Sequence, residues 1–177
     1  MEIHLIIFDA DGTLIARDSG QLLPGVAEYS SLLNHPGCRN RPALAVATNQ
    51  GGPACRDAGW GDHYPALAQV ESRYGALAAQ LGARLYMSLI YIDKSGGIYI
   101  PAGLPADDPR LSLSWRKPQP GMLRQAMLDA GALPQNTLFI GDSPDDQAAA
   151  RAAGCAFIFA QKFFARGWTP GQDWDLH

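Results

Sequence analysis

Five short apolar runs constrain the fold of this 177-residue chain more than any other feature. Each run is rich in Ile, Leu, Val or Phe, and runs of this length predict strands that are buried on both faces. They cover residues 3–8, 43–47, 84–91, 137–140 and 155–160. Strands of this kind are typical of a parallel sheet.

Helix-like stretches alternate with the apolar runs, over residues 25–33, 65–81, 120–130 and 144–153. Three of them end at a glycine, which a helix C-cap favours, and the prolines that begin the last two suit the first helical turn. These residues are Gly82, Gly131, Gly154, Pro120 and Pro144. The alternation predicts an α/β fold, in which helices cover both faces of a parallel sheet.

Two segments depart from this alternation. Residues 90–101 predict a hairpin or excursion, because a D-K-S-G-G turn sequence lies between apolar flanks, and they continue into a Pro/Asp-rich loop at 102–113. The tail over 163–177 is expected to fold back onto the body, with a dimer contact or a lip over the active site as alternatives. Its aromatic residues are Phe163, Phe164, Trp168 and Trp174.

The composition, with 47% hydrophobic and 18% charged residues, is that of a globular protein. A net charge of −3 argues against a nucleic-acid partner, which usually requires a basic face. Cys38, Cys55 and Cys155 lack the spacing of a zinc site and indicate reduced thiols. The run at 3–8 is too short for a signal peptide or a membrane span. We therefore expect one domain over residues 1–177, cytoplasmic, and monomeric or homodimeric.

Polar side chains directly follow three of the predicted strands, and a lysine precedes a helix on the same side. In an open parallel sheet the carboxyl ends of the strands form one edge, where ligands bind. The sequence therefore predicts one site at this edge, built from residues far apart in the chain. The residues are Asp9, Asp11, Thr48, Asn49, Asp142 and Lys117.

Phosphoryl transfer is the chemistry that this set suggests. A carboxylate such as Asp9 attacks a phosphoryl group only if the repulsion between two anions is removed, which a divalent cation and an ammonium group achieve together. Asp9 and Asp142, with a backbone carbonyl near Asp11, would supply the hard oxygens that Mg²⁺ prefers. Asp11 is then the acid for the leaving oxygen and the base for the hydrolytic water. Gly12 leaves room for the phosphate, and Thr13 can pin the loop.

The phosphate oxygens would be bound by residues that follow the second strand and by one cation. Lys117 would neutralise one oxygen, and the Thr48 hydroxyl with the Asn49 backbone N–H would bind another. We place Gln50, the next residue, with the phosphate-binding group.

Four motifs occur in a fixed order: D-x-D-G-T at 9–13, T-N-Q-G-G at 48–52, R-K-P-x-P-G-M at 116–122 and G-D-x-x-x-D at 141–146. This arrangement resembles the haloacid dehalogenase (HAD) superfamily. The resemblance implies a Rossmann-like three-layer sandwich, Mg²⁺ dependence, Asp9 as nucleophile and Asp11 as general acid/base. It implies phosphate binding by Thr48 and Lys117, and Mg²⁺ binding by Asp142 with Asp146 behind it. The second Asp of the first motif favours phosphatase over dehalogenase chemistry.

The spacing leaves too little chain between the first two motifs for a helical cap, so we expect no large cap domain. Two of the motifs also resemble a branch that holds heptose-bisphosphate phosphatase, histidinol-phosphatase and the 3′-phosphatase of polynucleotide kinase. In the first two of these, Arg116 would contact the substrate. The chain departs from the branch in two ways: residues 86–115 lack the Cys and His of a zinc loop, and Ser143 replaces a Lys or Arg.

Several alternatives remain open from the sequence. Asp145 either complements the helix N-terminus or belongs to the shell around the ligands, and Arg116 either contacts substrate or pairs with a surface carboxylate. The favoured function is hydrolysis of a small phosphorylated metabolite such as a sugar phosphate. A polynucleotide 3′-phosphatase is the alternative. A non-catalytic binding protein is disfavoured because Asp9 and Asp11 are both present.

Overall fold

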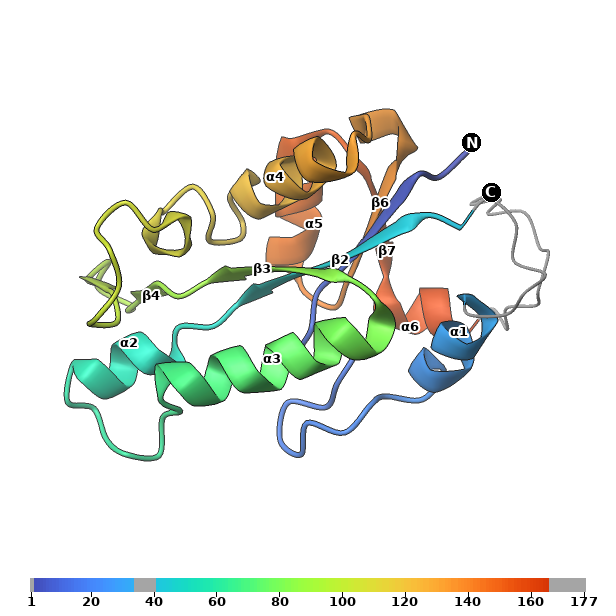
Figure 1. Ribbon diagram of the computed structural model, residues 1–177. Coiled ribbons are helices and arrows are strands. Elements are labelled where there is room, and N and C mark those ends of the chain that lie inside the picture. Colours follow the sequence, from blue (N-terminus) through green and yellow to red (C-terminus); the bar gives the residue numbers. More distant parts are fainter. Residues whose placement is uncertain (1, 34–40, 166–177) are drawn as a thin grey trace.

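Five parallel strands form a central sheet in the order β3-β2-β1-β6-β7 (Figure 1). The structure, a computed structural model, describes residues 2–33 and 41–165. The strands are β1 Leu5–Phe8, β2 Ala43–Asn49, β3 Arg84–Ser88, β6 Thr137–Gly141 and β7 Ala156–Phe159. Phe8, at the end of β1, lies opposite Val46 and Ile140 of its two neighbours, so these three strands end at the same edge.

Helices cover both faces of this sheet, which confirms the predicted Rossmann-like sandwich. In Figure 1, α4 and α5 lie on one face, and α1, α3 and α6 lie on the other. The helices are α1 Val26–Leu33, α2 Gly52–Asp57, α3 Leu67–Leu81, α4 Gly121–Ala130, α5 Pro144–Ala153 and α6 Ala160–Phe164, with 3₁₀ turns η1 Pro109–Leu111 and η2 Pro134–Asn136.

The residues of β1 show why the strand needs both layers. Ile6 and Phe8 pack into the apolar cluster with α1, α3 and α6, whereas Leu5 and Ile7 pack into the cluster with α4 and α5. All four side chains are fully buried. An apolar run without polar alternation is therefore what this central position requires.

The predicted strand at 84–91 is shorter in the structure. β3 ends at Ser88, and the chain then forms an antiparallel hairpin of β4 Tyr91–Ile92 and β5 Ile98–Tyr99, as the turn sequence predicts. The Asp93 carboxylate closes the turn by accepting backbone N–H bonds at 2.8 Å from Ser95 and Gly97. In the described part of the chain this hairpin and the loop after β1 are small, and neither builds a cap domain.

Two short helices, α2 and α6, were not predicted, and α6 begins where the last apolar run was expected to end. Phe163 of α6 is fully buried, with its ring centroid 6.1 Å from that of Phe8 and 5.1 Å from that of Tyr29. The predicted return of the tail onto the body is thus found for Phe163. Trp168 and Trp174 lie outside the described residues, as does Cys38. None of the described helices has the length and apolarity to cross a membrane.

We predict that Phe163→Ala lowers the free energy of unfolding by about 3–5 kcal/mol, because it leaves a cavity between aromatic rings. Urea denaturation followed by circular dichroism measures the change. Leu128→Ala is the control, since the Leu128 side chain is 74% exposed and its loss should have little effect. Equal losses in the two variants would contradict the packing of α6 described above.

Candidate active site

The Lys117 ammonium group is buried between two carboxylates at the carboxyl edge of the sheet. Its Nζ atom lies 2.5 Å from Asp9 Oδ1 and 2.7 Å from Asp146 Oδ1. It also donates a hydrogen bond of 2.9 Å to the Ala47 carbonyl in β2. The lysine side chain is 4% exposed. One cation therefore joins the residue after β1, the end of β2 and the first turn of α5.

Burial and charge act in opposite directions on this group of residues. Burial raises the pKa of Asp9 to about 6, although the ammonium of Lys117 opposes the rise. For Lys117, burial lowers the pKa, but the two carboxylates outweigh it, and the pKa lies above its usual value. Lys117 is therefore charged at neutral pH, and its charge favours the ionised form of Asp9.

The Asp146 side chain organises the loop that carries Asp142. Its Oδ2 atom accepts hydrogen bonds from the backbone N–H of Asp142 at 3.2 Å, and from the backbone N–H and hydroxyl of Ser143 at 3.0 and 2.6 Å. The Ser143 hydroxyl in turn accepts from the Asp146 N–H, which caps α5. Asp146 thus contacts Lys117 through one oxygen and the Asp142 loop through the other.

The carboxylates present fit a Mg²⁺ ion. One oxygen from each of Asp9, Asp142 and Asp146 lies within 4.8 Å of the others. Asp142 Oδ1 is buried and has no hydrogen-bond partner in the described residues, while Oδ2 pairs with Arg17 at 2.8 Å. A buried, unpaired carboxylate oxygen is costly unless a ligand satisfies it. Because Lys117 already occupies Asp146 Oδ1, Asp9 and Asp142 are the better candidates for the metal.

Gly12 makes room for Asp142. Its φ is +88°, and a Cβ atom at this position would lie 2.1 Å from Asp142 Oδ2. The sequence predicted that Gly12 lets the backbone approach the phosphate, and the same lack of a side chain also accommodates the Asp142 carboxylate. Thr13 is buried, and its hydroxyl, predicted to pin the loop, has no hydrogen-bond partner within residues 2–33 and 41–165.

The Asp11 carboxylate is held by its own donors. Asp11 Oδ2 accepts hydrogen bonds from Gln50 Nε2 at 2.6 Å and from the Tyr74 hydroxyl at 2.7 Å. Arg73 Nη2 lies 3.8 Å from Asp11 Oδ1. These contacts hold the Asp11 carboxylate against Gln50 and two residues of α3, and leave Oδ1 without a hydrogen bond in the described part of the chain. Gln50 Nε2 also donates to the Thr48 hydroxyl at 2.9 Å.

Asn49 fixes the backbone of Lys117. Its side-chain Nδ2 donates to the Lys117 carbonyl at 3.0 Å, and its Oδ1 accepts from the Lys117 N–H at 3.1 Å. This pair of bonds spans the gap between β2 and the loop before α4. The side chain of Asn49 thus acts on the lysine, a role that the sequence did not suggest.

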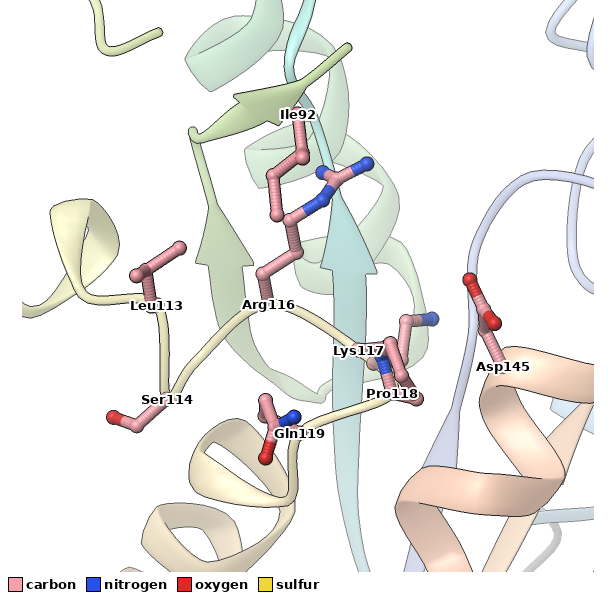
Figure 2. Close-up of a pocket in the computed structure, with 8 residues that line it drawn as sticks. All are labelled: Ile92, Leu113, Ser114, Arg116, Lys117, Pro118, Gln119 and Asp145. Atoms are coloured by element: carbon pink, nitrogen blue, oxygen red, sulfur yellow. The ribbon is translucent and has the colours of Figure 1, made fainter. Parts of the chain in front are cut away.

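A cavity of about 570 Å³ opens next to Lys117. Figure 2 shows Arg116, Lys117 and Asp145 around it, with Ile92 from the hairpin on one side. Arg116 Nη1 donates to the Ile90 carbonyl at 2.6 Å, and the guanidinium has no ion pair in the described part of the chain. Burial lowers the pKa of Arg116. The exposed carboxylate of Asp145 lines the same cavity and its charge opposes this lowering, so both predicted roles of Arg116 stay open.

Three residues at the site were missed by sequence reasoning: Arg17, Arg73 and Tyr74. Arg17 lies in the loop after β1, and the other two lie on α3, where the sequence shows only a helical apolar pattern. Their contacts join positions far apart in the chain, and no local motif marks them.

Comparison with known proteins identifies the family. The family described as HAD-hydrolase-like matches residues 114–162. A D-glycero-D-manno-heptose-1,7-bisphosphate 7-phosphatase of Thermosynechococcus vestitus is 36% identical over 166 residues, which cover 90% of this chain and 79% of that protein. A D-glycero-beta-D-manno-heptose-1,7-bisphosphate 7-phosphatase of Pseudomonas aeruginosa is 33% identical over 151 residues, covering 85% and 72%. The chain belongs to the HAD superfamily of phosphatases.

A solved structure shares the fold. The crystal structure of D,D-heptose 1,7-bisphosphate phosphatase from B. bronchiseptica, complexed with magnesium and phosphate, superposes with a TM-score of 0.57 at 24% identity. The match covers 97% of this chain and 89% of that chain. The predicted HAD fold and the predicted phosphatase class are confirmed.

We predict that Lys117→Met lowers the free energy of unfolding at pH 7.5 by about 3–5 kcal/mol, because it leaves buried carboxylates without a cation. The loss should shrink as the pH falls from 7 toward 4. Burial already raises the pKa of Asp9 to about 6, and the methionine removes the charge that opposes this rise. The folded variant then binds a proton that the unfolded chain does not, and this stabilises it at lower pH.

Urea denaturation at several pH values measures this difference. Lys162→Met, a change at an exposed lysine of α6, is the control and should have little effect at any pH. A loss for Lys117→Met that does not depend on pH would contradict the assignment of Asp9 as the carboxylate left unpaired.

Proposed function

We propose that this protein is a Mg²⁺-dependent phosphomonoester hydrolase that acts on a small phosphorylated metabolite through an aspartyl-phosphate on Asp9. The observation that carries the proposal is the buried Lys117 ammonium, 2.5 Å from Asp9 and 2.7 Å from Asp146, beside the unpaired Asp142 oxygen. The ammonium, together with a divalent cation bound by the unsatisfied carboxylate, would reduce the repulsion between Asp9 and an anionic phosphoryl group.

The relatives support a phosphorylated sugar as the first class of substrate to test. The two relatives described above are named for the 7-phosphatase reaction on a heptose bisphosphate. This chain lacks Cys and His over residues 86–115. Other side chains of that segment, among them Ile92, Leu113 and Ser114, line the cavity beside Lys117. We therefore propose the broader class, a small sugar phosphate or related metabolite, rather than that one substrate.

In the first step the Asp9 carboxylate attacks the phosphorus atom, forming a new P–O bond while the ester P–O bond breaks. Asp11 gives its proton to the leaving oxygen, so the alcohol departs neutral. Lys117 neutralises a phosphate oxygen, and the Thr48 hydroxyl with the Asn49 backbone N–H binds another. Asn49 holds the Lys117 backbone in register for this contact.

In the second step a water molecule attacks the phosphorus atom of the aspartyl-phosphate. Asp11, now ionised, takes a proton from this water, and inorganic phosphate leaves with Asp9 restored. Gln50 keeps Asp11 and Thr48 in a fixed relation through its two hydrogen bonds. Mg²⁺, held by Asp9, Asp142 and a backbone carbonyl near Asp11, would reduce the repulsion between the substrate and the carboxylates.

Arg116 is proposed to contact the substrate from the cavity beside Lys117, because its guanidinium is half-buried and forms no close ion pair with a described carboxylate, although the charge of Asp145 acts on it. Asp146 is proposed as a positioning residue, through Lys117 and the Asp142 loop. A cytoplasmic location, one domain over residues 1–177, and a monomer or homodimer remain predictions from the sequence.

We predict that Asp9→Asn lowers Mg²⁺-dependent phosphate release on the order of 10⁴-fold or more, since the nucleophile is lost. A panel of sugar phosphates and other small phosphomonoesters, followed by inorganic phosphate detection, provides the measurement. Asp107→Asn, a change at an exposed carboxylate in the loop before η1, is the matched control. A wild-type protein that releases no phosphate from any member of the panel would refute the proposal. Release from a 3′-phosphorylated oligonucleotide alone would favour the polynucleotide alternative.

We predict that Asp142→Asn raises the Mg²⁺ concentration needed for half-maximal activity by roughly tenfold or more, because a charged ligand oxygen is lost. Asp145→Asn should have a smaller effect, since this exposed carboxylate lines the Arg116 cavity and has no part in the acidic cluster. Magnesium titrations of both variants at fixed substrate give the comparison. Equal shifts would place Asp145 among the groups around the metal.

A further inference from the structure

A second cavity, of about 340 Å³, borders the Asp11 side of the site. It lies between α3 and the loop before it, and it shares no lining residue with the cavity beside Lys117. Gln50 and Tyr74, the two side chains that donate hydrogen bonds to Asp11, line this cavity. Its other lining residues are Asp62, His63, Tyr64, Pro65, Gln69, Val70 and Arg73.

Asp11 contacts three residues of this cavity, and its hydrogen bonds determine which of its oxygens is left free. Oδ2 is occupied by two donors, at 2.6 and 2.7 Å, so Oδ1 is the oxygen left to exchange a proton with the substrate. Oδ1 is also the oxygen nearest to Arg73, at 3.8 Å. A general acid must lie within hydrogen-bond reach of the leaving oxygen. An alcohol protonated by Oδ1 is therefore released beside Arg73.

Arg73 is held in place and forms a long ion pair with Asp11, without a hydrogen bond between the two side chains. Its distance of 3.8 Å to Oδ1 exceeds that of a hydrogen bond. The guanidinium lies over the Tyr74 ring, 5.5 Å from its centroid, and against Gly20, where a Cβ atom would approach Arg73 Nη2 to 2.8 Å. Among the described residues the nearby Asp62 does not compete for Arg73, since it pairs with Arg56 at 2.8 Å.

We propose that this cavity is the leaving-group subsite, and that Arg73 binds an anionic substituent of the alcohol, either a carboxylate or a second phosphate. The inference rests on the proposed function, because it takes Asp11 as the general acid. It selects, among small phosphomonoesters, those whose alcohol carries a second negative charge. Guanidinium groups bind both carboxylate and phosphate through paired N–H donors, so the side chain suits either substituent.

The experiment uses two esters that differ at one position. 3-Phosphoglycerate and glycerol 3-phosphate share the phosphate and the adjacent carbons, but the first has a carboxylate where the second has a hydroxymethyl group. We predict that the wild type prefers 3-phosphoglycerate in kcat/KM, and that Arg73→Gln reduces this preference roughly tenfold, mainly through KM, because one charge-assisted contact is lost. A parallel comparison of fructose 1,6-bisphosphate with fructose 1-phosphate distinguishes a second phosphate from a carboxylate.

Two variants separate anion binding from a general effect on Asp11. Tyr74→Phe removes a donor to Asp11 at the neighbouring position, so it should lower kcat on both esters and leave their ratio unchanged. Arg73→Lys keeps the charge and should restore part of the preference. Arg116→Gln, a change in the cavity beside Lys117, should leave the preference for the anionic ester unchanged.

The outcomes are distinct. An unchanged ratio in Arg73→Gln, or a wild type without preference for either anionic ester, overturns the subsite. A ratio that changes in Arg116→Gln and not in Arg73→Gln also overturns it, since the anion then binds beside Lys117. A wild type that hydrolyses no ester refutes the proposed function, and with it this inference, whereas hydrolysis of esters without an anion preference leaves the proposed function intact.

Discussion

The buried ammonium group of Lys117 is the interaction on which the rest of the site depends. It contacts Asp9 after β1, the Ala47 carbonyl of β2 and Asp146 of α5, so one charge links three elements that are far apart in the sequence. A carboxylate without this cation would lose its hydration and gain nothing in return. The lysine thus allows an ionisable group to stand at the end of a fully apolar strand, where the fold alone would not accept it.

The same interaction ties the assembly of the site to the folding of the chain. Asn49 holds the Lys117 backbone, and Asp146 holds the loop of Asp142. Each carboxylate has its own restraint: Asp11 through Gln50 and Tyr74, and Asp142 through Arg17. Asp11 and Asp142 are thus held by different side chains, so two carboxylates of the same site have different surroundings.

Much of the fold follows from the sequence, because apolar runs and helix-capping residues are local signals. The five strands and four of the helices lie close to their predicted ranges, and α5 begins and ends where its proline and glycine indicate. The short helices α2 and α6 were missed, because a stretch of one or two turns has little periodicity. The edge of the sheet where Asp9, Thr48 and Asp142 meet was predictable, since parallel strands bring their carboxyl ends together. The contacts of Arg17, Arg73 and Tyr74 were not, because they depend on how α3 and the loop after β1 pack against that edge.

The strands differ in how many neighbours they pair with, and therefore in how readily they open locally. β1 pairs with a strand on each side, whereas β3 and β7 each have one neighbour in the sheet, and the β4–β5 hairpin contains only two residues in each strand. Local opening starts where backbone pairing and buried contacts are fewest. The hairpin, whose Ile92 lines the cavity beside Lys117, is therefore expected to open locally before the central strands do. Its movement would change the shape of this cavity while Asp9, which follows the central strand, keeps its position.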